Sequence, residues 1–297
     1  MRVAVTGAGG FIGRPLVRQL AEAGHGVTSI ARRASPPPGA ERHCAGDVRA
    51  EEMWHNVGPV EAVVHLAGLS DASLSRDRPL EYNAVNAFGT LVALEAARRL
   101  GALFVLASSQ RVYRARREPL GEEDLLEPVD PYGYSKLVAE QWVAMYRRLL
   151  GLPTIVLRFF SVYGPGQMPG GGSSGVVALF MTRALRGDAL VVHGRAWRDF
   201  TYVGDVVSGI RLALESARSV GGVYNIATGV ATATEELARA VVAVTGSPST
   251  VRAEDGNQPG ESFVANIARA QQDLGYQPVV PLREGLERYA QWLRGQR

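Results

Sequence analysis

Cysteine, a secretion signal and long apolar runs are features that this sequence lacks or nearly lacks. Its 297 residues include one cysteine, Cys44, so no disulfide can form within the chain, which is typical of a reducing compartment. The first residues show no charged segment followed by an apolar segment and a cleavage site, and no apolar run reaches the length of a membrane span. We therefore expect a cytoplasmic protein that has no membrane as a partner.

An excess of charge of one sign is also missing. The 32 Lys and Arg residues and the 29 Asp and Glu residues leave a net charge of +3, and the arginines are scattered without a basic–aromatic repeat. This pattern argues against nucleic acid as a partner and is compatible with a small anionic ligand. Internal repeats and an interdomain linker are absent as well, while a hydrophobic share of 46% is enough for a large core.

The N-terminal stretch, MRVAVTGAGGFIG, predicts a pyrophosphate site. Residues 3–5 are small or β-branched and apolar, which is typical of a strand buried on both faces, and a helical pattern follows residue 13. Between them, three glycines allow a tight turn, bring phosphate oxygens close to backbone N–H groups and let the helix approach the sheet. We therefore expect a dinucleotide to contact this turn at Gly7, Gly10, Phe11, Ile12 and Gly13.

The end of the second expected strand, residues 26–30, bears on the choice of dinucleotide. Sites for NAD usually carry an acid at this end, where it accepts hydrogen bonds from the adenosine ribose. Here the position is Ala31, followed by Arg32 and Arg33. Because a guanidinium suits a 2′-phosphate, we expect Arg32 and Arg33 to bind the cofactor and to favour NADP(H), with NAD(H) as the alternative. The two arginines could instead only solvate the start of a loop.

A second informative stretch follows the fifth expected strand, residues 103–109. In open α/β sheets, the active-site residues lie at the carboxyl ends of the strands. Tyr132 and Lys136 are four residues apart on a predicted helix, so both project from one face. A phenol ionises at about pH 10 in water, and we expect a nearby ammonium and a positively charged nicotinamide to lower that pKa. Tyr134 has Val138 at the same offset, which makes Tyr132 the better catalytic candidate.

Together these motifs resemble the extended short-chain dehydrogenase/reductases, and specifically the NAD(P)-dependent sugar-nucleotide epimerase/dehydratase family. The resemblance runs nearly end to end, in the order TGAGGFIG, HLAG, SSQRVY, YGYSK, LRFFSVYGP, WRDFTYVGDVV and YNIATG. It implies that Ser109 hydrogen-bonds the reacting sugar oxygen, that Tyr132 is the acid/base and that Lys136 binds the nicotinamide ribose. We also expect cofactor contacts from two loops that follow strands, at Asp47, Val48, Leu66 and Ala67.

Asp47 and His65 can also be explained by purely structural roles that involve no ligand. Asp47, where the resemblance places the adenine amino group, could instead cap a helix that begins near Ala50. His65 lies in an apolar strand, and no second metal ligand has useful spacing. We therefore expect a packed core histidine and no metal site.

The expected fold is α/β: a doubly wound, Rossmann-type sheet of seven parallel strands with helices on both faces, and a smaller C-terminal α/β lobe. Residues 1–160, completed by about 198–226, would form the dinucleotide-binding domain. Residues 161–197 and 227–297 would form the substrate-binding lobe, with the site in the crevice between the two. The resemblance also implies a homodimer, formed through the helices that begin near Asn83 and Tyr132.

Departures from the family pattern narrow the chemistry. Family dehydratases resemble one another in an Asp-Glu pair directly after the serine, because elimination needs an acid and a base. Gln110 and Arg111 stand there in this chain, and neither exchanges a proton at neutral pH, so dehydration is not expected. Arg111 also begins a cluster with Arg114, Arg116 and Arg117 that we expect to be a solvated basic loop. Alternatively, one of these arginines meets a sugar carboxylate or phosphate.

The substrate is expected to be a nucleotide-activated sugar, linked to UDP, dTDP, GDP or CDP. By the resemblance, Arg198 of the Arg-Asp-Phe motif binds the diphosphate, although it could pair with Asp199 instead. Ser161 replaces the family's usual asparagine, and Gln258 replaces a late arginine. The glycine-rich residues 164–175 would form a mobile loop over the sugar. The expected substrate-binding residues are Ser109, Gln110, Ser161 and Arg198.

Hydride transfer at a carbinol or ketone remains once dehydration is set aside. Because an NADP(H)-type site suits a reductase, we expect an NADPH-dependent ketoreductase that acts at C4 of a nucleotide-linked 4-keto-hexose. The alternative is a nucleotide-sugar 4-epimerase that holds its cofactor tightly. A non-catalytic NADP(H)-binding regulator is a third possibility, which the intact Ser109, Tyr132 and Lys136 argue against.

Overall fold

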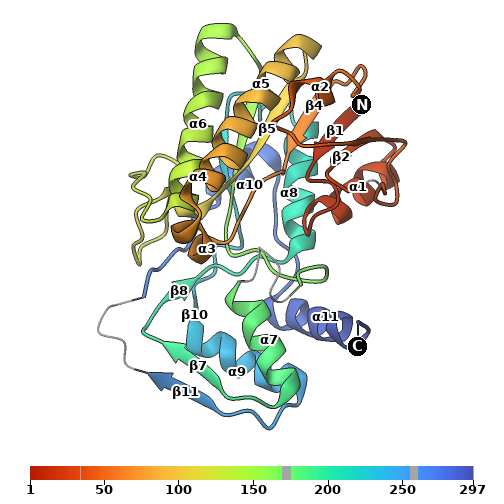
Figure 1. Ribbon diagram of the computed structural model, residues 1–297. Helices are drawn as coiled ribbons and strands as arrows, with labels where there is room; N and C mark the ends of the chain where they lie inside the picture. The colour runs from red at the N-terminus through yellow and green to blue at the C-terminus, as the bar shows by residue number, and fades with distance from the viewer. Residues whose placement is uncertain (34, 169–174, 255–259, 297) are drawn as a thin grey trace.

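One parallel sheet of seven strands organises the larger part of the molecule (Figure 1). The computed structural model describes residues 1–33, 35–168, 175–254 and 260–296. The strand order reverses between β1 and β4, which makes the switch point where open α/β sheets bind ligands. The expected doubly wound sheet is confirmed. In spatial order its strands are β3 (Arg42–Ala45), β2 (Gly26–Ala31), β1 (Arg2–Thr6), β4 (Ala62–His65), β5 (Leu103–Ser109), β6 (Thr154–Phe159) and β9 (Val223–Ile226).

Helices cover both faces of this sheet, and each face has its own apolar core. Both faces of β1, β4 and β6 are buried, which explains why these strands are continuous apolar runs without alternation. On one face lie α1 (Gly13–Glu22), α8 (Val203–Glu215) and α10 (Ala268–Leu274). On the other lie α2 (Glu51–Trp54), α5 (Gly89–Leu100) and α6 (Pro131–Leu150).

The approach to α5 is less regular than its sequence pattern predicts. The pattern indicates one helix over residues 82–100, but the chain forms α4 (Pro79–Tyr82), a wide π-helical turn (Asn83–Phe88) and then α5. A further short helix, α3 (Ala72–Asp77), precedes them. Within the described residues, no helix combines the length and the apolarity that crossing a membrane would require.

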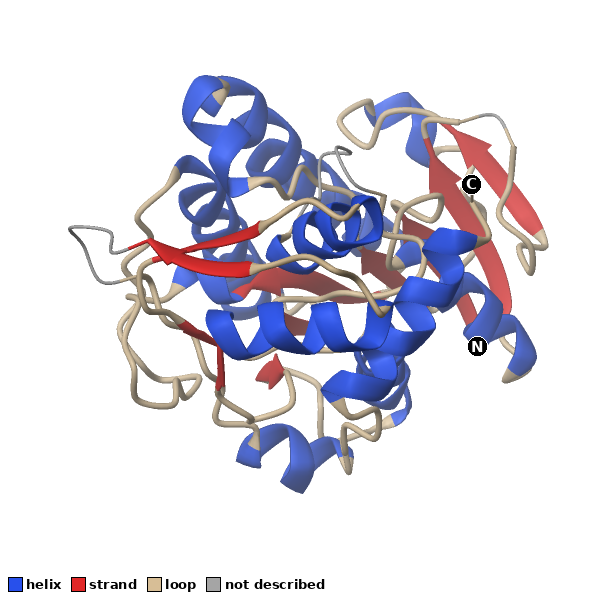
Figure 2. Cartoon of the chain, turned by 90° about the horizontal axis from the view of Figure 1, so that it is seen from below, coloured by secondary structure: helices blue, strands red, loops and turns tan. Residues whose placement is uncertain are grey.

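A smaller part lies below the carboxyl ends of the sheet strands (Figure 1). Its helices share one apolar core with the first of two parallel strands, and Figure 2 shows that strand pair from below with helices beside it. A short antiparallel pair, β8 (Trp197–Arg198) and β10 (Thr232–Ala233), lies between the two parts. The elements of the smaller part are α7 (Val176–Arg186), β7 (Leu190–His193), α9 (Thr234–Thr245), β11 (Val251–Glu254) and α11 (Leu282–Arg294).

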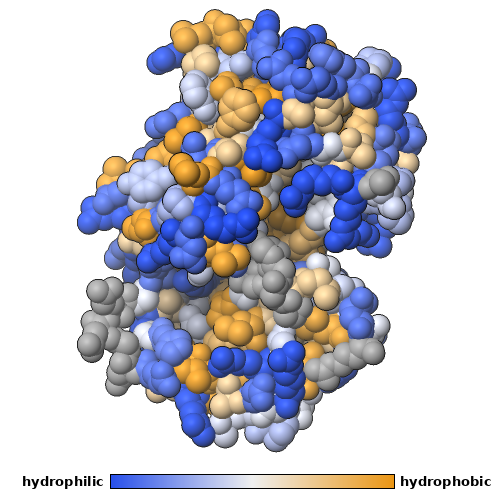
Figure 3. All heavy atoms as spheres, viewed as in Figure 1, coloured by the Kyte–Doolittle hydropathy of each residue, from blue (hydrophilic) through white to orange (hydrophobic). Residues whose placement is uncertain are grey.

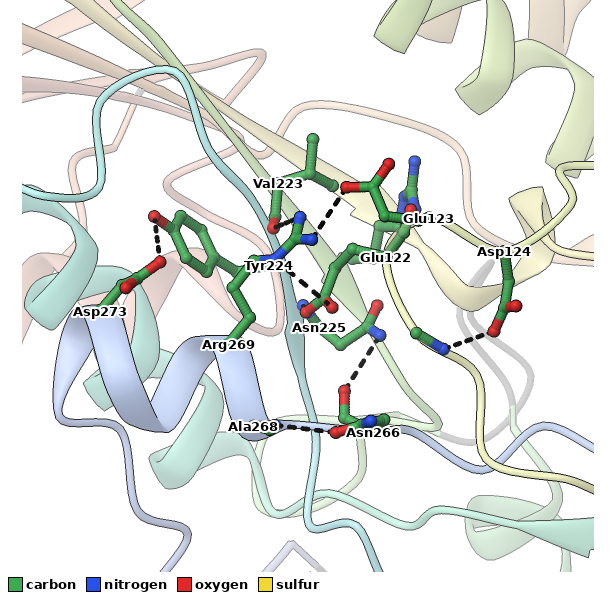
Figure 4. A network of polar contacts seen from close by, with 12 residues as sticks. Glu122, Glu123, Asp124, Val223, Tyr224, Asn225, Asn266, Ala268, Arg269 and Asp273 are labelled. Atoms are coloured by element: carbon green, nitrogen blue, oxygen red, sulfur yellow. Dashed lines mark hydrogen bonds and ion pairs between the residues drawn. The ribbon is translucent and has the colours of Figure 1, made fainter.

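The C-terminal segment crosses between the two parts twice. Phe263 forms a bridge with Arg198, and Ala265 forms one with Leu120. Then α10, which falls within the residues expected for the substrate-binding lobe, packs on the sheet beside α8 and β9, and α11 returns to the smaller part. Figure 4 shows polar contacts at this crossing, among them the bond that Asn225 of β9 donates to the backbone of Asn266, at 3.2 Å. Asn225 also donates to the backbone of Leu120, at 2.9 Å.

Candidate active site

A cavity of about 490 Å³ opens along the carboxyl ends of β1, β2 and β4, and its floor is the glycine turn. Gly7 has a positive φ of 65°, and a Cβ there would lie 2.8 Å from the backbone nitrogen of Ala67. A Cβ on Gly13 would overlap the carbonyl oxygen of Gly7. The turn therefore has to be bare backbone, as close approach to a pyrophosphate requires. The lining includes every residue expected to bind cofactor, namely Gly7, Gly10, Phe11, Ile12, Gly13, Arg32, Arg33, Asp47, Val48, Leu66, Ala67 and Lys136.

The end of this cavity next to β2 carries more positive than negative charge, and it is where we expect the adenosine of a dinucleotide to bind. Ala31, Arg32 and Arg33 line it at the end of β2. The Asp47 carboxylate accepts two bonds from the Arg49 guanidinium, at 3.0 and 2.6 Å, and this hydrogen bonding keeps the pKa of Asp47 below its usual value. The alternative that Asp47 caps a helix is wrong, because α2 begins after Ala50.

The catalytic candidates meet where β5 ends and α6 begins. Asp130 caps α6 by accepting from the backbone N–H of Gly133, at 2.8 Å. A Cβ on Gly133 would overlap the carbonyl oxygen of Arg111, so this glycine lets the first turn of α6 approach the end of β5. As a result Tyr132, only 8% exposed, hydrogen-bonds with Ser109, whereas Tyr134 is 55% exposed. The structure thus favours Tyr132 over Tyr134, as its sequence position predicts.

Lys136 is buried beside these residues, and its own pKa is shifted by that burial. Its ammonium donates to the carbonyl oxygen of Ala107 at 2.9 Å, and burial lowers the pKa of Lys136 to about 8, against the opposing charge of Glu140. Burial also raises the pKa of Tyr132, although the hydrogen bond from Ser109 opposes the change. Among the protein groups, burial therefore outweighs the hydrogen bond and the positive charges at this phenol. That an ammonium and a positively charged nicotinamide together lower the pKa of Tyr132 stays a prediction.

A buried ion pair underlies this group, and the sequence motifs gave no direct sign of it. Arg158 of β6 donates to both carboxylate oxygens of Glu140, at 3.0 Å through Nε and 2.6 Å through Nη2, and both side chains are buried. Glu140 also accepts from Ser108, the neighbour of Ser109. Its position four residues after Lys136 on the same helix was the one available signal.

A second cavity, also of about 490 Å³, adjoins the first and lies between the two parts of the molecule. Figure 3 shows the surface hollowed at this boundary. Both cavities are lined by Tyr132, so the phenol stands where they meet. The second cavity brings together all four expected substrate-binding residues, Ser109, Gln110, Ser161 and Arg198. Of the expected mobile loop, residues 169–174 lie outside the described part of the chain.

Arg198 lines this cavity, and it does not pair with Asp199, its neighbour in the sequence. The buried Asp199 carboxylate instead accepts bonds from Thr228 and from the backbone of Gly229, at 2.6 to 2.8 Å. Burial, followed by repulsion from Arg111, lowers the pKa of Arg198 to about 10. A desolvated guanidinium that lines a cavity in this way is suited to bind an anion.

The basic cluster after β5 is not uniformly a solvated loop. That expectation fits Arg114, whose side chain is 66% exposed. It is wrong for Arg111, which lines the second cavity and pairs with Asp130 and Glu261. Arg117 is exposed as well, and its guanidinium lies over the ring of Trp197, 4.3 Å from its centre.

His65 is a packed histidine, as expected. Its Nδ1 lies 3.0 Å from the hydroxyl of Thr6, and burial, helped by the charge of Lys136, lowers its pKa to about 3. In the described ranges, no group of three His, Cys, Asp or Glu side chains could hold a metal ion.

Comparison with known proteins decides the family. The model of the NAD dependent epimerase/dehydratase family matches residues 3–227. The chain belongs to this family. It is an enzyme of the extended short-chain dehydrogenase/reductase type, as its motifs predict.

Three similar proteins show how far the likeness extends. The UDP-glucose 4-epimerase of Mycolicibacterium smegmatis is 33% identical over 99% of each chain. The structure of a Thermotoga maritima UDP-glucose 4-epimerase with UDP-glucose has a TM-score of 0.91 and 30% identity, covering 100% of this chain and 99% of that one. MoeE5 in complex with UDP-glucuronic acid and NAD has a TM-score of 0.90 and 33% identity over 100% of both chains. Within the epimerase/dehydratase family, these similarities support the 4-epimerase alternative better than the ketoreductase.

Proposed function

We propose that this enzyme is a nucleotide-sugar 4-epimerase that acts on a UDP-hexose. One observation carries the proposal: Ser109, Tyr132 and Lys136 converge where the cavity over the glycine turn meets a second cavity lined by Arg198. The relatives named as UDP-glucose 4-epimerases match along nearly their whole length. Elimination of water is disfavoured, because Gln110 lines the cavity after Ser109 where an acid would be needed.

Tyr132 and Ser109 would perform the proton chemistry at the sugar. When bound, the dinucleotide supplies the acceptor and later the donor of a hydride. As a phenolate, the form that a positively charged nicotinamide would favour, Tyr132 would take the proton of the C4 hydroxyl and would return it after the ketone has presented its other face. Ser109 donates a hydrogen bond toward the phenolic oxygen and orients the sugar oxygen. Lys136, whose pKa of about 8 keeps it charged at neutral pH, would hold the nicotinamide ribose of a bound dinucleotide.

The diphosphate of the substrate would bind Arg198. This guanidinium lines the second cavity and, in the part of the chain that the structure describes, forms no ion pair. Desolvation strengthens its attraction for an anion, since few water molecules compete. Replacing Arg198 by Ala should therefore raise the KM for the nucleotide sugar at least about tenfold.

The adenosine end favours NADP(H) by its charge, although NAD(H) is what MoeE5 binds. Neither Arg32 nor Arg33 forms an ion pair among the described residues, so both guanidiniums are available to a 2′-phosphate. Titration with both dinucleotides tests this: NADP⁺ should bind more tightly, and an Arg32→Ala, Arg33→Ala variant should lose that preference. A wild-type preference for NAD⁺ would overturn it.

A homodimer would bury apolar side chains that the monomer leaves exposed. Leu80, Phe88 and Tyr134 are exposed on α4, the π turn and α6, which contact one another. Sedimentation should show a dimer that Phe88→Glu weakens. A wild-type monomer at micromolar concentration would refute this interface.

The enzymatic proposal is tested by incubating the purified enzyme with UDP-glucose and following UDP-galactose by NMR. Product should form without net change in the nicotinamide absorbance, and Tyr132→Phe should lower turnover by roughly a hundredfold or more. Stoichiometric loss of NADPH with a 4-ketosugar would instead show a ketoreductase. A protein that binds dinucleotide but converts no nucleotide sugar would be a regulator.

A further inference from the structure

The wall of the second cavity next to Tyr132 is formed by a guanidinium that already has two carboxylate partners. Arg111 lies 3.3 Å from Asp130 and also pairs with Glu261, which is 150 residues later in the chain. Its guanidinium packs over the ring of Phe263, 5.4 Å from the ring centre. The side chain of Arg111 is 19% exposed and that of Glu261 is 35% exposed, so Glu261 is the more accessible of the two.

This ion-paired group is held in place. The backbone N–H of Arg111 donates to Ser109 Oγ at 3.2 Å, and Asp130 is fixed as the cap of α6. Arg111 therefore cannot move far from the catalytic residues, and its charge acts on Tyr132. With one guanidinium and two carboxylates, the group carries a net negative charge.

The other guanidinium of the cavity has the opposite character. Arg198 has no carboxylate at ion-pair distance within the described residues, and only the more distant charge of Glu261 attracts it. Both guanidiniums lie near the ring of Phe263, 5.4 and 6.0 Å from its centre, but their charge balance differs. Arg198 offers a free cation, which suits a diphosphate, whereas Arg111 offers a cation that is already neutralised.

We propose that Glu261, by occupying Arg111, restricts the sugar subsite to hexoses with an uncharged C6 group and disfavours hexuronates. This inference rests on the proposed 4-epimerase function. In a hexuronate the carboxylate is attached to C5, next to the reacting C4. A substrate whose C4 oxygen meets Ser109 and Tyr132 would bring that carboxylate toward the Arg111 wall, where Glu261 and Asp130 repel it and Arg111 is not free to compensate. A neutral hydroxymethyl group meets no such repulsion.

The test compares kcat/KM for UDP-glucose and UDP-glucuronate on the same enzyme preparation. We expect the wild type to favour UDP-glucose by roughly 50-fold, and Glu261→Gln to shift that ratio toward UDP-glucuronate by about tenfold. The matched control is Glu235→Gln, which removes a carboxylate paired with Arg239 at 2.6 Å on the exposed side of α9 and should leave the ratio unchanged. A loss of folded enzyme lowers both values and does not move the ratio.

A double variant shows whether Arg111 mediates the effect. Because the gain for UDP-glucuronate comes from the released guanidinium, Arg111→Gln combined with Glu261→Gln should remove most of it. A wild-type preference for UDP-glucuronate, or a ratio that Glu261→Gln leaves unchanged, would overturn the inference while the 4-epimerase function stands. If neither sugar is epimerised, the proposed function fails, and calorimetric affinities of the same two nucleotide sugars for the same variants decide the specificity separately.

Discussion

Replacing Lys136 by methionine should make the protein more stable while it removes turnover. The ammonium of Lys136 is buried, and it donates a hydrogen bond to the carbonyl oxygen of Ala107 at 2.9 Å. Methionine has a similar length and carries no charge, so it can fill the same space. The substitution therefore separates the effect of Lys136 on the free energy of unfolding from its effect on catalysis.

The magnitude follows from the pKa of Lys136. A pKa lowered from 10.5 to about 8 corresponds to about 3 kcal/mol of unfavourable free energy for the charged form in the folded state. At pH 7 both the folded and the unfolded chain are protonated, so this cost is fully present. Loss of the bond to Ala107 offsets about 1 kcal/mol, which leaves a gain of about 2 kcal/mol. For a chain of this size that raises Tm by about 4 °C.

Thermal unfolding at a series of pH values, without added nucleotide, checks both the sign and the cause. Wild-type stability should rise relative to Lys136→Met between pH 8 and 10.5, since there the folded chain releases the proton that the unfolded chain still holds. The advantage of the variant should therefore shrink across that interval. A variant that is less stable at pH 7, or whose advantage does not change with pH, would refute the reasoning.

Three further outcomes are expected. Glu140→Gln should move the alkaline limb of the pH profile of kcat to lower pH, because the charge of Glu140 raises the pKa of Lys136. Glu140→Asp should largely restore the wild-type profile, and an unshifted limb in Glu140→Gln would contradict this role of Glu140. Ser109→Ala should lower kcat by about 10- to 100-fold with a smaller change in KM, as it removes the hydrogen bond to Tyr132; equal effects on both would point to binding alone. Gly133→Ala should destabilise the fold by about 1–3 kcal/mol in chemical denaturation, since its Cβ would overlap backbone at the end of β5; unchanged stability would contradict that overlap.

Much of the fold could be predicted because its determinants are local. Continuous apolar runs indicated strands buried on both faces, and the glycines of the N-terminal turn are required by contacts within a few residues or with the adjacent strand. The preference for Tyr132 over Tyr134 likewise followed from helical spacing, since only Tyr132 faces the interior.

What could not be predicted depends on partners that are distant in sequence. The sequence around Arg111 does not indicate that it pairs with Glu261, and the arginine cluster taken alone predicts a solvated loop. Helical spacing likewise shows that Lys136 is near Tyr132, but it does not show how deeply the two groups are buried. That burial raises the pKa of Tyr132 and lowers the pKa of Lys136. Charge balance and desolvation are properties of the assembled interior.

The double crossing of the C-terminal segment governs when the enzyme can first work as it leaves the ribosome. Strands β1 to β6 emerge early, but the cover that α10 and Tyr276 give to the sheet comes from residues 268–276. The stretch before them supplies Gly260 to the second cavity and Phe263 beneath Arg111. The site is therefore assembled only after residues 260–276 have been synthesised, and a stop before them would yield a fragment with an uncovered apolar face.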